Sequence, residues 1–205
     1  MNKIITISRE FGSGGREVGK RLSDVLGFKY YDKEIIEEIA KRTGTSNEYV
    51  GNISEMGLYN FPFQFGKTFY SNISIQANQT EILVMQQKIL KEIAKEGDCI
   101  IVGRGADVIL KEYNPMNIFV YSNMESKIER CRKKGKENEN FSDKELKNKI
   151  KQIDKERIKF HDVLSNLEWG EKENYDLCIN TSNLEIKKII PSLAEYITNW
   201  FEGRK

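Results

Sequence analysis

The first forty residues alternate between strand and helix patterns of hydrophobic positions. Residues 1–8 predict a strand, and residues 16–26 predict a helix because their apolar side chains recur every three or four positions. A short strand at 28–31 and a helix after Asp32 repeat this order, with Asp32 a suitable N-cap. A strand–helix–strand–helix order is typical of a parallel sheet covered by helices.

The pattern loosens between residues 43 and 78. This segment is polar, and we expect helical pieces around an irregular flap at about residues 44–79. The flap contains an aromatic cluster. Three roles are open for it: packing of the flap onto the core, stacking on a base, or a subunit contact. Its members are Tyr59, Phe61, Phe63, Phe65, Phe69 and Tyr70.

Three more strands are predicted in the rest of the chain, at residues 99–102, 117–121 and 175–180. Apolar residues at helical spacing predict helices at residues 80–95, 124–134, 146–153 and 186–200. The five strands therefore predict one α/β domain over residues 1–205, a three-layer α/β/α fold with a five-stranded parallel sheet. Ligands are expected where the carboxyl ends of the strands meet.

Composition excludes several classes of protein. Of the 205 residues, 39% are hydrophobic and 31% charged, which excludes disorder throughout. The net charge is +2, from 33 basic and 31 acidic residues, and this is too small to indicate nucleic-acid or membrane binding by the chain as a whole. The longest apolar runs are strand-sized, so we predict no membrane span and no export signal.

The cysteines and the single histidine do not predict a metal site. Cys99, Cys131 and Cys178 are an odd number and lack CxxC spacing. We interpret them as reduced core thiols in the cytoplasm. His161 stands alone in the sequence, and we expect it to be a lid or surface residue rather than a base.

A glycine-rich loop, Gly12-Ser13-Gly14-Gly15, lies between the first strand and the first helix. Glycines let backbone N–H groups converge on an anion, and the N-terminus of the helix adds a favourable dipole. The alternative is an ordinary tight turn. Its place between strand and helix favours phosphate binding.

The loop departs from the usual P-loop pattern. The lysine that follows the second glycine of that pattern is replaced by Gly15, and the following hydroxyl residue by Arg16. A GxxxxGK frame at residues 14–20 is rejected because Lys20 lies inside the predicted helix. Arg16 or Arg9 could supply the missing positive charge, although an arginine fork is not equivalent to an ammonium group. We hypothesise that Arg16 replaces the lysine, because it lies at the start of the helix.

Four segments together resemble the cytidylate kinase-like family, relatives of bacterial cytidylate kinases. They are residues 4–27 (IITISREFGSGGREVGKRLSDVLG), Tyr30-Tyr31-Asp32, Val102-Gly103-Arg104-Gly105 and residues 175–181 (YDLCINT). The resemblance implies a P-loop nucleoside monophosphate kinase fold with a helical lid. It also implies ATP and Mg²⁺ as cofactors and a nucleotide such as CMP as the acceptor.

The resemblance also implies roles for individual residues. Asp32 matches the acidic residue near the acceptor and the metal, and Arg104 matches the arginine of the Gly-Arg-Asp motif that holds the acceptor. The sequence departs from the family at Gly105, where the motif has aspartate although Asp107 is close by. It departs again at Glu38, where an arginine for the acceptor phosphate is expected.

The lid is expected at about residues 135–165, between the last two strands. Residues 127–160 contain 13 basic and 7 acidic residues, a local excess of +6. Asp154 and Arg157 form a DxxR arrangement similar to the lid motif of the family, and Arg130 and Arg132 lie on the helix that leads into the lid. Four lysines at i+4 spacing indicate a solvated helix face rather than a site; they are Lys147, Lys151, Lys155 and Lys159.

The leading hypothesis is a phosphotransferase in which a basic lid closes over ATP, Mg²⁺ and a small acceptor. Its predicted catalytic residues are Arg16, Arg104, Arg157 and Asp32. Its predicted nucleotide-binding residues are Arg9, Gly12, Ser13, Gly14, Gly15, Arg16 and Arg130. No protein side chains are predicted to form a metal site of their own.

Two alternatives remain beside the kinase. A nucleotide or anion sensor on the same fold is favoured by the missing lysine and hydroxyl. A nucleic-acid binder using residues 127–159 is disfavoured because aromatic residues are sparse there and acidic residues are interspersed. The amphipathic helices and the aromatic cluster permit a homodimer as well as a monomer.

Overall fold

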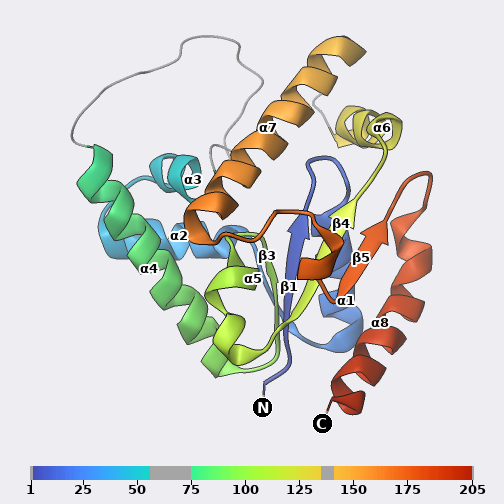
Figure 1. The fold of residues 1–205 in the computed structure, drawn as a ribbon, viewed down its shortest axis with the longest axis horizontal. Coiled ribbons are helices and arrows are strands. Elements are labelled where there is room, and N and C mark those ends of the chain that lie inside the picture. Colours follow the sequence, from blue (N-terminus) through green and yellow to red (C-terminus); the bar gives the residue numbers. More distant parts are fainter. Residues whose placement is uncertain (1, 56–74, 135–140, 205) are drawn as a thin grey trace.

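The chain folds around one parallel sheet (Figure 1). The computed structural model describes residues 2–55, 75–134 and 141–204. The elements in these residues are β1 (Ile4–Arg9), α1 (Gly15–Leu26), β2 (Lys29–Tyr31), α2 (Lys33–Thr43), α3 (Asn47–Glu55), α4 (Ile75–Glu96), β3 (Cys99–Val102), α5 (Ala106–Ile109), η1 (Lys111–Tyr113), β4 (Met116–Tyr121), α6 (Met124–Lys134), α7 (Asp143–Leu164), η2 (Lys172–Asn174), β5 (Leu177–Asn180) and α8 (Ile186–Gly203).

The sheet places β1 at its centre. The strand order is β2-β3-β1-β4-β5, and all four pairings are parallel. Ile5 of β1 pairs with Ile100 of β3 on one side and with Met116 of β4 on the other. Because the strand order reverses at β1, the crevice at its carboxyl end is where an open sheet of this kind binds ligands. The glycine loop leaves β1 at this point.

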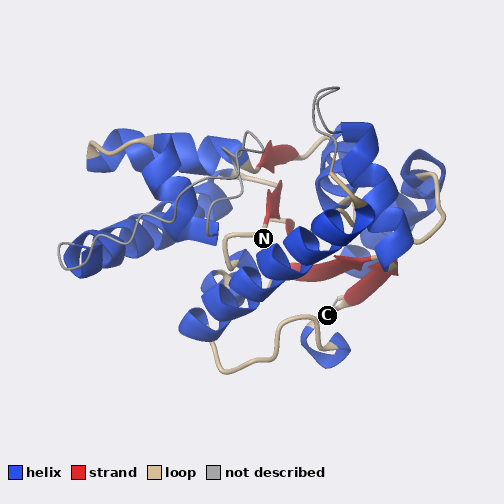
Figure 2. Ribbon diagram, turned by 90° about the horizontal axis from the view of Figure 1, so that it is seen from above, coloured by secondary structure: helices blue, strands red, loops and turns tan. Residues whose placement is uncertain are grey.

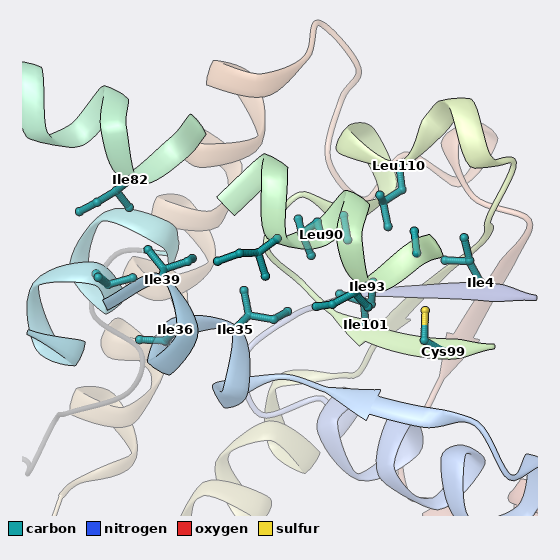
Figure 3. Packing of buried hydrophobic residues seen from close by; sticks show 14 of the residues in the cluster. Ile4, Ile35, Ile36, Ile39, Ile82, Leu90, Ile93, Cys99, Ile101 and Leu110 are labelled. Atoms are coloured by element: carbon teal, nitrogen blue, oxygen red, sulfur yellow. The ribbon is translucent and has the colours of Figure 1, made fainter. Parts of the chain in front are cut away.

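Successive side chains of β1 point alternately into two hydrophobic cores, one on each face of the sheet. Ile4 packs with residues of α2 and α4, the cluster shown in Figure 3. Ile5 and Ile7 pack instead with residues of α1 and α8. Figure 2 shows the helices on both sides of the strands. The predicted three-layer α/β/α fold with five parallel strands is confirmed.

Helix α7 lies across the carboxyl end of the sheet (Figure 1). Its start is fixed by a capping box, in which Ser142 accepts from the Glu145 amide and the Glu145 carboxylate accepts from the Ser142 amide. Its apolar side chains, including Leu146 and Ile150, are buried. The helix extends from residue 143 to residue 164, longer than the turns at 146–153 from which it was predicted.

Several other boundaries differ from the sequence expectations. Helix α4 begins at Ile75 rather than at residue 80, and the short helix α5 was not predicted because four residues show no period. The aromatic cluster at residues 59–70 lies outside the described residues. The described part of the expected flap begins with α3.

The cysteines only partly match the expectation of core thiols. All three are free, but Cys99 alone is buried, and burial raises the pKa of its thiol to about 12. Cys131 and Cys178 are half-buried. No helix within the described residues is long and apolar enough to span a membrane.

Candidate active site

The glycine loop is shaped by two left-handed residues. Gly12 and Gly14 have φ of 75° and 85°, and Gly14 is the N-cap of α1. A Cβ at Gly12 would lie 3.0 Å from the carbonyl oxygen of Lys127, and one at Gly14 would collide with the Ile186 side chain. Glycine is therefore required at both positions. The loop ends where α1 begins, at Gly15. The backbone N–H groups in the first turn of a helix have no partner inside the helix.

Arg9 occupies the space beside Gly15. Its side chain is almost completely buried, with 3% of the residue exposed. A Cβ at Gly15 would lie 2.6 Å from Arg9 Cβ and 2.9 Å from Arg9 Cγ. No lysine side chain fits at this position while Arg9 keeps its place. Of the two arginines predicted to replace the loop lysine, Arg9 is the one that packs against the lysine position.

Arg16 instead lies against Asp32. The Arg16 Nε atom is 3.0 Å from Asp32 Oδ2, and the Asp32 side chain is 6% exposed. Asp32 is the N-cap residue of α2, as predicted, but its side chain makes no capping hydrogen bond to the helix. The pair joins the first turn of α1 to the end of β2, the side of the site where an acceptor is expected.

A buried charge network ties the loop to α6 and α7. The Phe11 amide donates to Asp154 Oδ1 at 2.7 Å. Lys127 Nζ lies 2.7 Å from Glu10 Oε2 and 3.5 Å from Asp154 Oδ2. Burial raises the pKa of Asp154 above its ordinary value, although Arg157, the Phe11 amide and Lys127 oppose the shift. Sequence analysis did not single out Lys127, because a lysine in a basic helix carries no signal of burial.

Arg157 reaches the loop from α7. One of its guanidinium nitrogens donates to the carbonyl oxygen of Arg9 at 2.5 Å and lies 3.4 Å from Asp154 Oδ1. Arg157 is buried, whereas the four lysines of the predicted solvated face are exposed, as expected. Helix α7 therefore places one guanidinium beside the end of β1 and directs its lysines to solvent.

A small pocket, with room for about one water molecule, lies where β1, the turn after β3 and α7 meet. Its lining residues are Ser8, Arg9, Gly103, Gly105, Asp107, Arg157, Phe160, His161 and Trp169. Two of the predicted cationic residues that approach the loop, Arg9 and Arg157, are among them. The pocket lies at the carboxyl end of β1, where the fold predicts a ligand.

Arg104 lies between the two lining glycines, Gly103 and Gly105. It is fully buried and left-handed, with φ 63°, and its carbonyl oxygen accepts a hydrogen bond from Gln86 Nε2 at 2.9 Å. A non-glycine residue in this conformation is uncommon and costs about 1–2 kcal/mol. Strain of this kind is concentrated at functional sites, which agrees with the candidate role of Arg104.

Asp107 and His161 face each other in the pocket. Asp107 Oδ2 is 3.2 Å from His161 Nε2, and their side chains are 8% and 4% exposed. His161 lies on α7, within the residues predicted as a lid, and it is buried rather than at the surface. Burial lowers the pKa of His161, but the hydrogen bond to Asp107 and its negative charge outweigh this, so that the pKa is raised above its usual value.

Arg130 is joined to the opposite side of the loop. Its guanidinium donates to the carbonyl oxygens of Ser13 and Thr181, and Thr181 Oγ1 donates to the same Ser13 oxygen at 2.7 Å. The Ser13 hydroxyl donates to the Glu10 carbonyl at 2.8 Å, so it holds the loop in shape. Arg132 lies away from the loop and pairs with exposed Asp143.

The sequence of the chain matches the model of the cytidylate kinase-like family over residues 4–183. The chain belongs to the cytidylate kinase-like family. A search of curated protein sequences found no match.

Solved structures give this member of the cytidylate kinase-like family the fold of P-loop kinases. An uncharacterized protein from Eubacterium ventriosum is 25% identical, with a TM-score of 0.69, and the match covers 96% of this chain and 98% of the other. Shikimate kinase from Bacteroides thetaiotaomicron is 16% identical, with a TM-score of 0.58 and coverage of 98% and 99%. A gluconokinase from Sinorhizobium meliloti is 12% identical, with a TM-score of 0.55 and coverage of 98% and 95%.

The described residues of this cytidylate kinase-like protein contain no cluster of three or more His, Cys, Asp or Glu side chains that could hold a metal ion. The hydroxyl position of the loop is Arg16, which pairs with Asp32. A magnesium ion at this site would therefore take its ligands from nucleotide phosphates and water, and Asp32 beside the first turn of α1 is a candidate carboxylate.

Proposed function

We propose that the protein is a phosphotransferase that moves the γ-phosphoryl group of ATP to a small acceptor, and that CMP is the nucleotide acceptor to test first. The observation that carries the proposal is the convergence of Arg9 and Arg157 on one pocket beside the glycine loop. Two cations from different elements at the end of the central strand suit an anion whose charge is redistributed during transfer. Family membership supports the same reaction class.

The loop suits the phosphates of ATP. Gly12 and Gly14 keep side chains out of the loop, and α1 begins directly after it. An anion at the start of α1 is stabilised by backbone N–H groups and by the helix dipole. Mg²⁺ bound with ATP would supply charge neutralisation across the phosphates. On the other side of the loop, Arg130 lies where it can support the nucleotide while it fixes the Ser13 carbonyl.

Each candidate residue receives a role from its position. Arg9 replaces the loop lysine, and Arg157 on α7 neutralises charge on the transferring group. Arg16 holds Asp32 at the acceptor side. Arg104 fixes the strained turn that forms the pocket wall. We propose that α7 acts as the lid and that the reaction depends on charge neutralisation and alignment.

A second function is favoured by the loop itself. Gly15 and Arg16 replace the lysine and the hydroxyl residue, and Arg9 fills the space that the lysine would need. A guanidinium does not reproduce the geometry of an ammonium group. The same fold would then bind a nucleotide without transferring a phosphoryl group, as a sensor. The three free thiols suit a reducing compartment, and we place either function in the cytoplasm.

The experiment measures ADP release from ATP and Mg²⁺ with each nucleoside monophosphate, and with gluconate and shikimate, which are the substrates named by two structural neighbours. The proposal expects ADP release that requires the presence of one particular acceptor. Arg157→Ala is expected to lower the rate by about 100-fold or more, the effect of removing one transition-state donor. Lys155→Ala removes an exposed cation from the same helix and is expected to leave the rate unchanged.

Two other outcomes contradict the proposal. Nucleotide that raises the melting temperature without acceptor-dependent ADP release contradicts the kinase and supports the sensor. Equal rates of ADP release by the Arg157 and Lys155 variants contradict the assigned site, because the reaction then does not use the pocket. Gel filtration at several protein concentrations distinguishes a monomer from a homodimer.

A further inference from the structure

The Asp107–His161 pair is the one titratable pair in the lining of the pocket that the proposed function leaves without a role. The pair connects two elements far apart in sequence, because Asp107 lies on α5 beside the sheet and His161 lies near the end of α7. Burying such a pair costs desolvation energy, and only good geometry repays it. A core of ordinary hydrophobic side chains would close this space at lower cost.

Each member of the pair has one atom left over. Asp107 Oδ2 contacts His161 Nε2, whereas Asp107 Oδ1 and His161 Nδ1 are buried and have no hydrogen-bond partner among the described residues. A buried carboxylate oxygen without a donor is unfavourable, because it has lost its hydration without gaining a hydrogen bond. Because Asp107 lines a pocket with room for about one water molecule, a hydroxyl group that enters this space can supply the missing donor.

The pocket also defines what kind of ligand this is. Arg9 and Arg157 line it together with Asp107, so that the positive charge proposed to act on the phosphoryl groups also favours an anionic acceptor, and one carboxylate oxygen is left for a hydrogen-bond donor. A hydroxyl group satisfies Asp107 Oδ1 without bringing a second negative charge to it. The complementary ligand is a compact anion that carries at least one hydroxyl group.

We propose that His161 is a positioning residue that holds Asp107 so that Asp107 Oδ1 accepts a hydrogen bond from a hydroxyl group of the anionic acceptor. This inference rests on the proposed function, since it concerns the acceptor half of the same site. Because His161 belongs to α7, the pair also links acceptor recognition to the helix that carries Arg157. Loss of either partner disorders the contact to the acceptor and leaves the glycine loop intact.

The charge on His161 depends on the groups that face it. Its positive form is favoured by Asp107 and by Asp162, its exposed neighbour on α7. Among the described residues, the other titratable or cationic groups that line or adjoin the pocket include Arg9 from β1, Arg104 in the turn after β3, Arg157 from α7 and Tyr175 before β5. Acceptor binding is therefore expected to weaken as the pH rises through the pKa of His161.

The sole histidine makes the test direct, because one imidazole Cε1 proton resonance in the NMR spectrum reports this site. The wild type, Asp107→Asn and Asp162→Asn are titrated with pH. The inference expects a clear fall in the pKa of His161 in Asp107→Asn and a much smaller fall in Asp162→Asn, the matched exposed control. Equal effects of the two substitutions would overturn the pairing on which the inference rests.

Binding is then measured with CMP, gluconate, shikimate and sulfate, a compact anion without a hydroxyl group, at about pH 6 and about pH 8. At least one of the three hydroxylated anions is expected to shift the His161 resonance at concentrations where sulfate does not. Asp107→Asn is expected to weaken that binding about ten- to a hundredfold, as for loss of a hydrogen bond to a charged group. No shift with any of the three, or unchanged binding by Asp107→Asn, would overturn the inference.

His161→Gln distinguishes positioning from a purely structural role. Glutamine keeps an N–H donor for Asp107 but cannot become charged. Binding by this variant is expected to be retained in part and to lose its pH dependence, whereas His161→Ala loses binding at both pH values. A pH profile of His161→Gln equal to that of the wild type refutes the inference, provided that thermal denaturation shows the variant folded.

The inference and the proposed function can fail separately. Binding that depends on Asp107 without ADP release supports the inference and contradicts the kinase. ADP release that is unaffected by Asp107→Asn supports the kinase and contradicts the inference.

Discussion

Gly15→Ala tests whether Arg9 has taken the place of the loop lysine. Gly15 is the first residue of α1, and its φ is not in the left-handed region, so that alanine is acceptable to the backbone there. The new Cβ, however, would lie 2.6 Å from Arg9 Cβ and 2.9 Å from Arg9 Cγ. These atoms lie near the Arg9 backbone on the central strand and cannot swing away as the end of a flexible side chain does.

The structure gives the size of the effect. Forcing one extra carbon into a packed site costs about 1–3 kcal/mol. For a chain of 205 residues this corresponds to a fall in melting temperature of about 2–12 °C. Gly203→Ala is the matched control, because Gly203 ends helix α8 and a Cβ there meets nothing within 4 Å. That substitution is expected to be neutral or stabilising by up to about 1 kcal/mol.

Thermal denaturation and ADP release are measured for both variants. Gly15→Ala is expected to lower the melting temperature and the rate together, because the collision moves the Arg9 guanidinium that the reaction uses. A Gly15→Ala protein that melts and reacts like Gly203→Ala would refute the placement of Arg9. Gly15→Lys extends the test, since a gain in rate would show that the lysine position is open after all.

Three further predictions concern the loop, the pocket wall and pH. Lys127→Met leaves the carboxylates of Glu10 and Asp154 without their shared cation. Because Glu10 is partly exposed, we expect urea denaturation to show a fall of about 3 kcal/mol in the free energy of unfolding. An unchanged urea midpoint would contradict the network. Gly105→Ala places a Cβ at φ 60° against side chains that already fill the space, so the free energy of unfolding should fall by about 2–4 kcal/mol in the same assay. An unchanged free energy of unfolding would contradict this prediction. The raised pKa of His161 means that its pairing stabilises the fold fully below about pH 6.5 and less as the pH rises through the folded-state pKa. Replacing its carboxylate partner with asparagine should therefore lower the melting temperature more at about pH 6 than at about pH 8, and equal losses would argue against a charged pair.

Much of the fold could be predicted because its signals are local. Strand β3 and helix α6 have the predicted boundaries, since each is a continuous run of one hydrophobic period between polar breaks. The glycine loop was also located from sequence, because a loop between a first strand and a helix has few other uses. The resemblance to the cytidylate kinase-like family joined these pieces into one fold, and the family match confirms the resemblance.

The site could be predicted only in part because its contacts join distant segments. The sequence favoured Arg16 over Arg9 as the replacement for the loop lysine, whereas the packing of Arg9 against Gly15 and the pairing of Arg16 with Asp32 favour Arg9. Asp107 and His161 are 54 residues apart, so that no local pattern connects them. The left-handed conformation of Arg104 leaves no trace in hydrophobic periodicity.

The most direct test of the account is transfer of a labelled γ-phosphoryl group from ATP, with Mg²⁺, to each acceptor of the panel by wild type, Arg157→Ala and Lys155→Ala. The account predicts a labelled product with one acceptor, made at equal rates by the wild type and Lys155→Ala and at least about 100-fold more slowly by Arg157→Ala. No labelled product from wild-type protein that binds ATP, or equal transfer by the Arg157 and Lys155 variants, would contradict it.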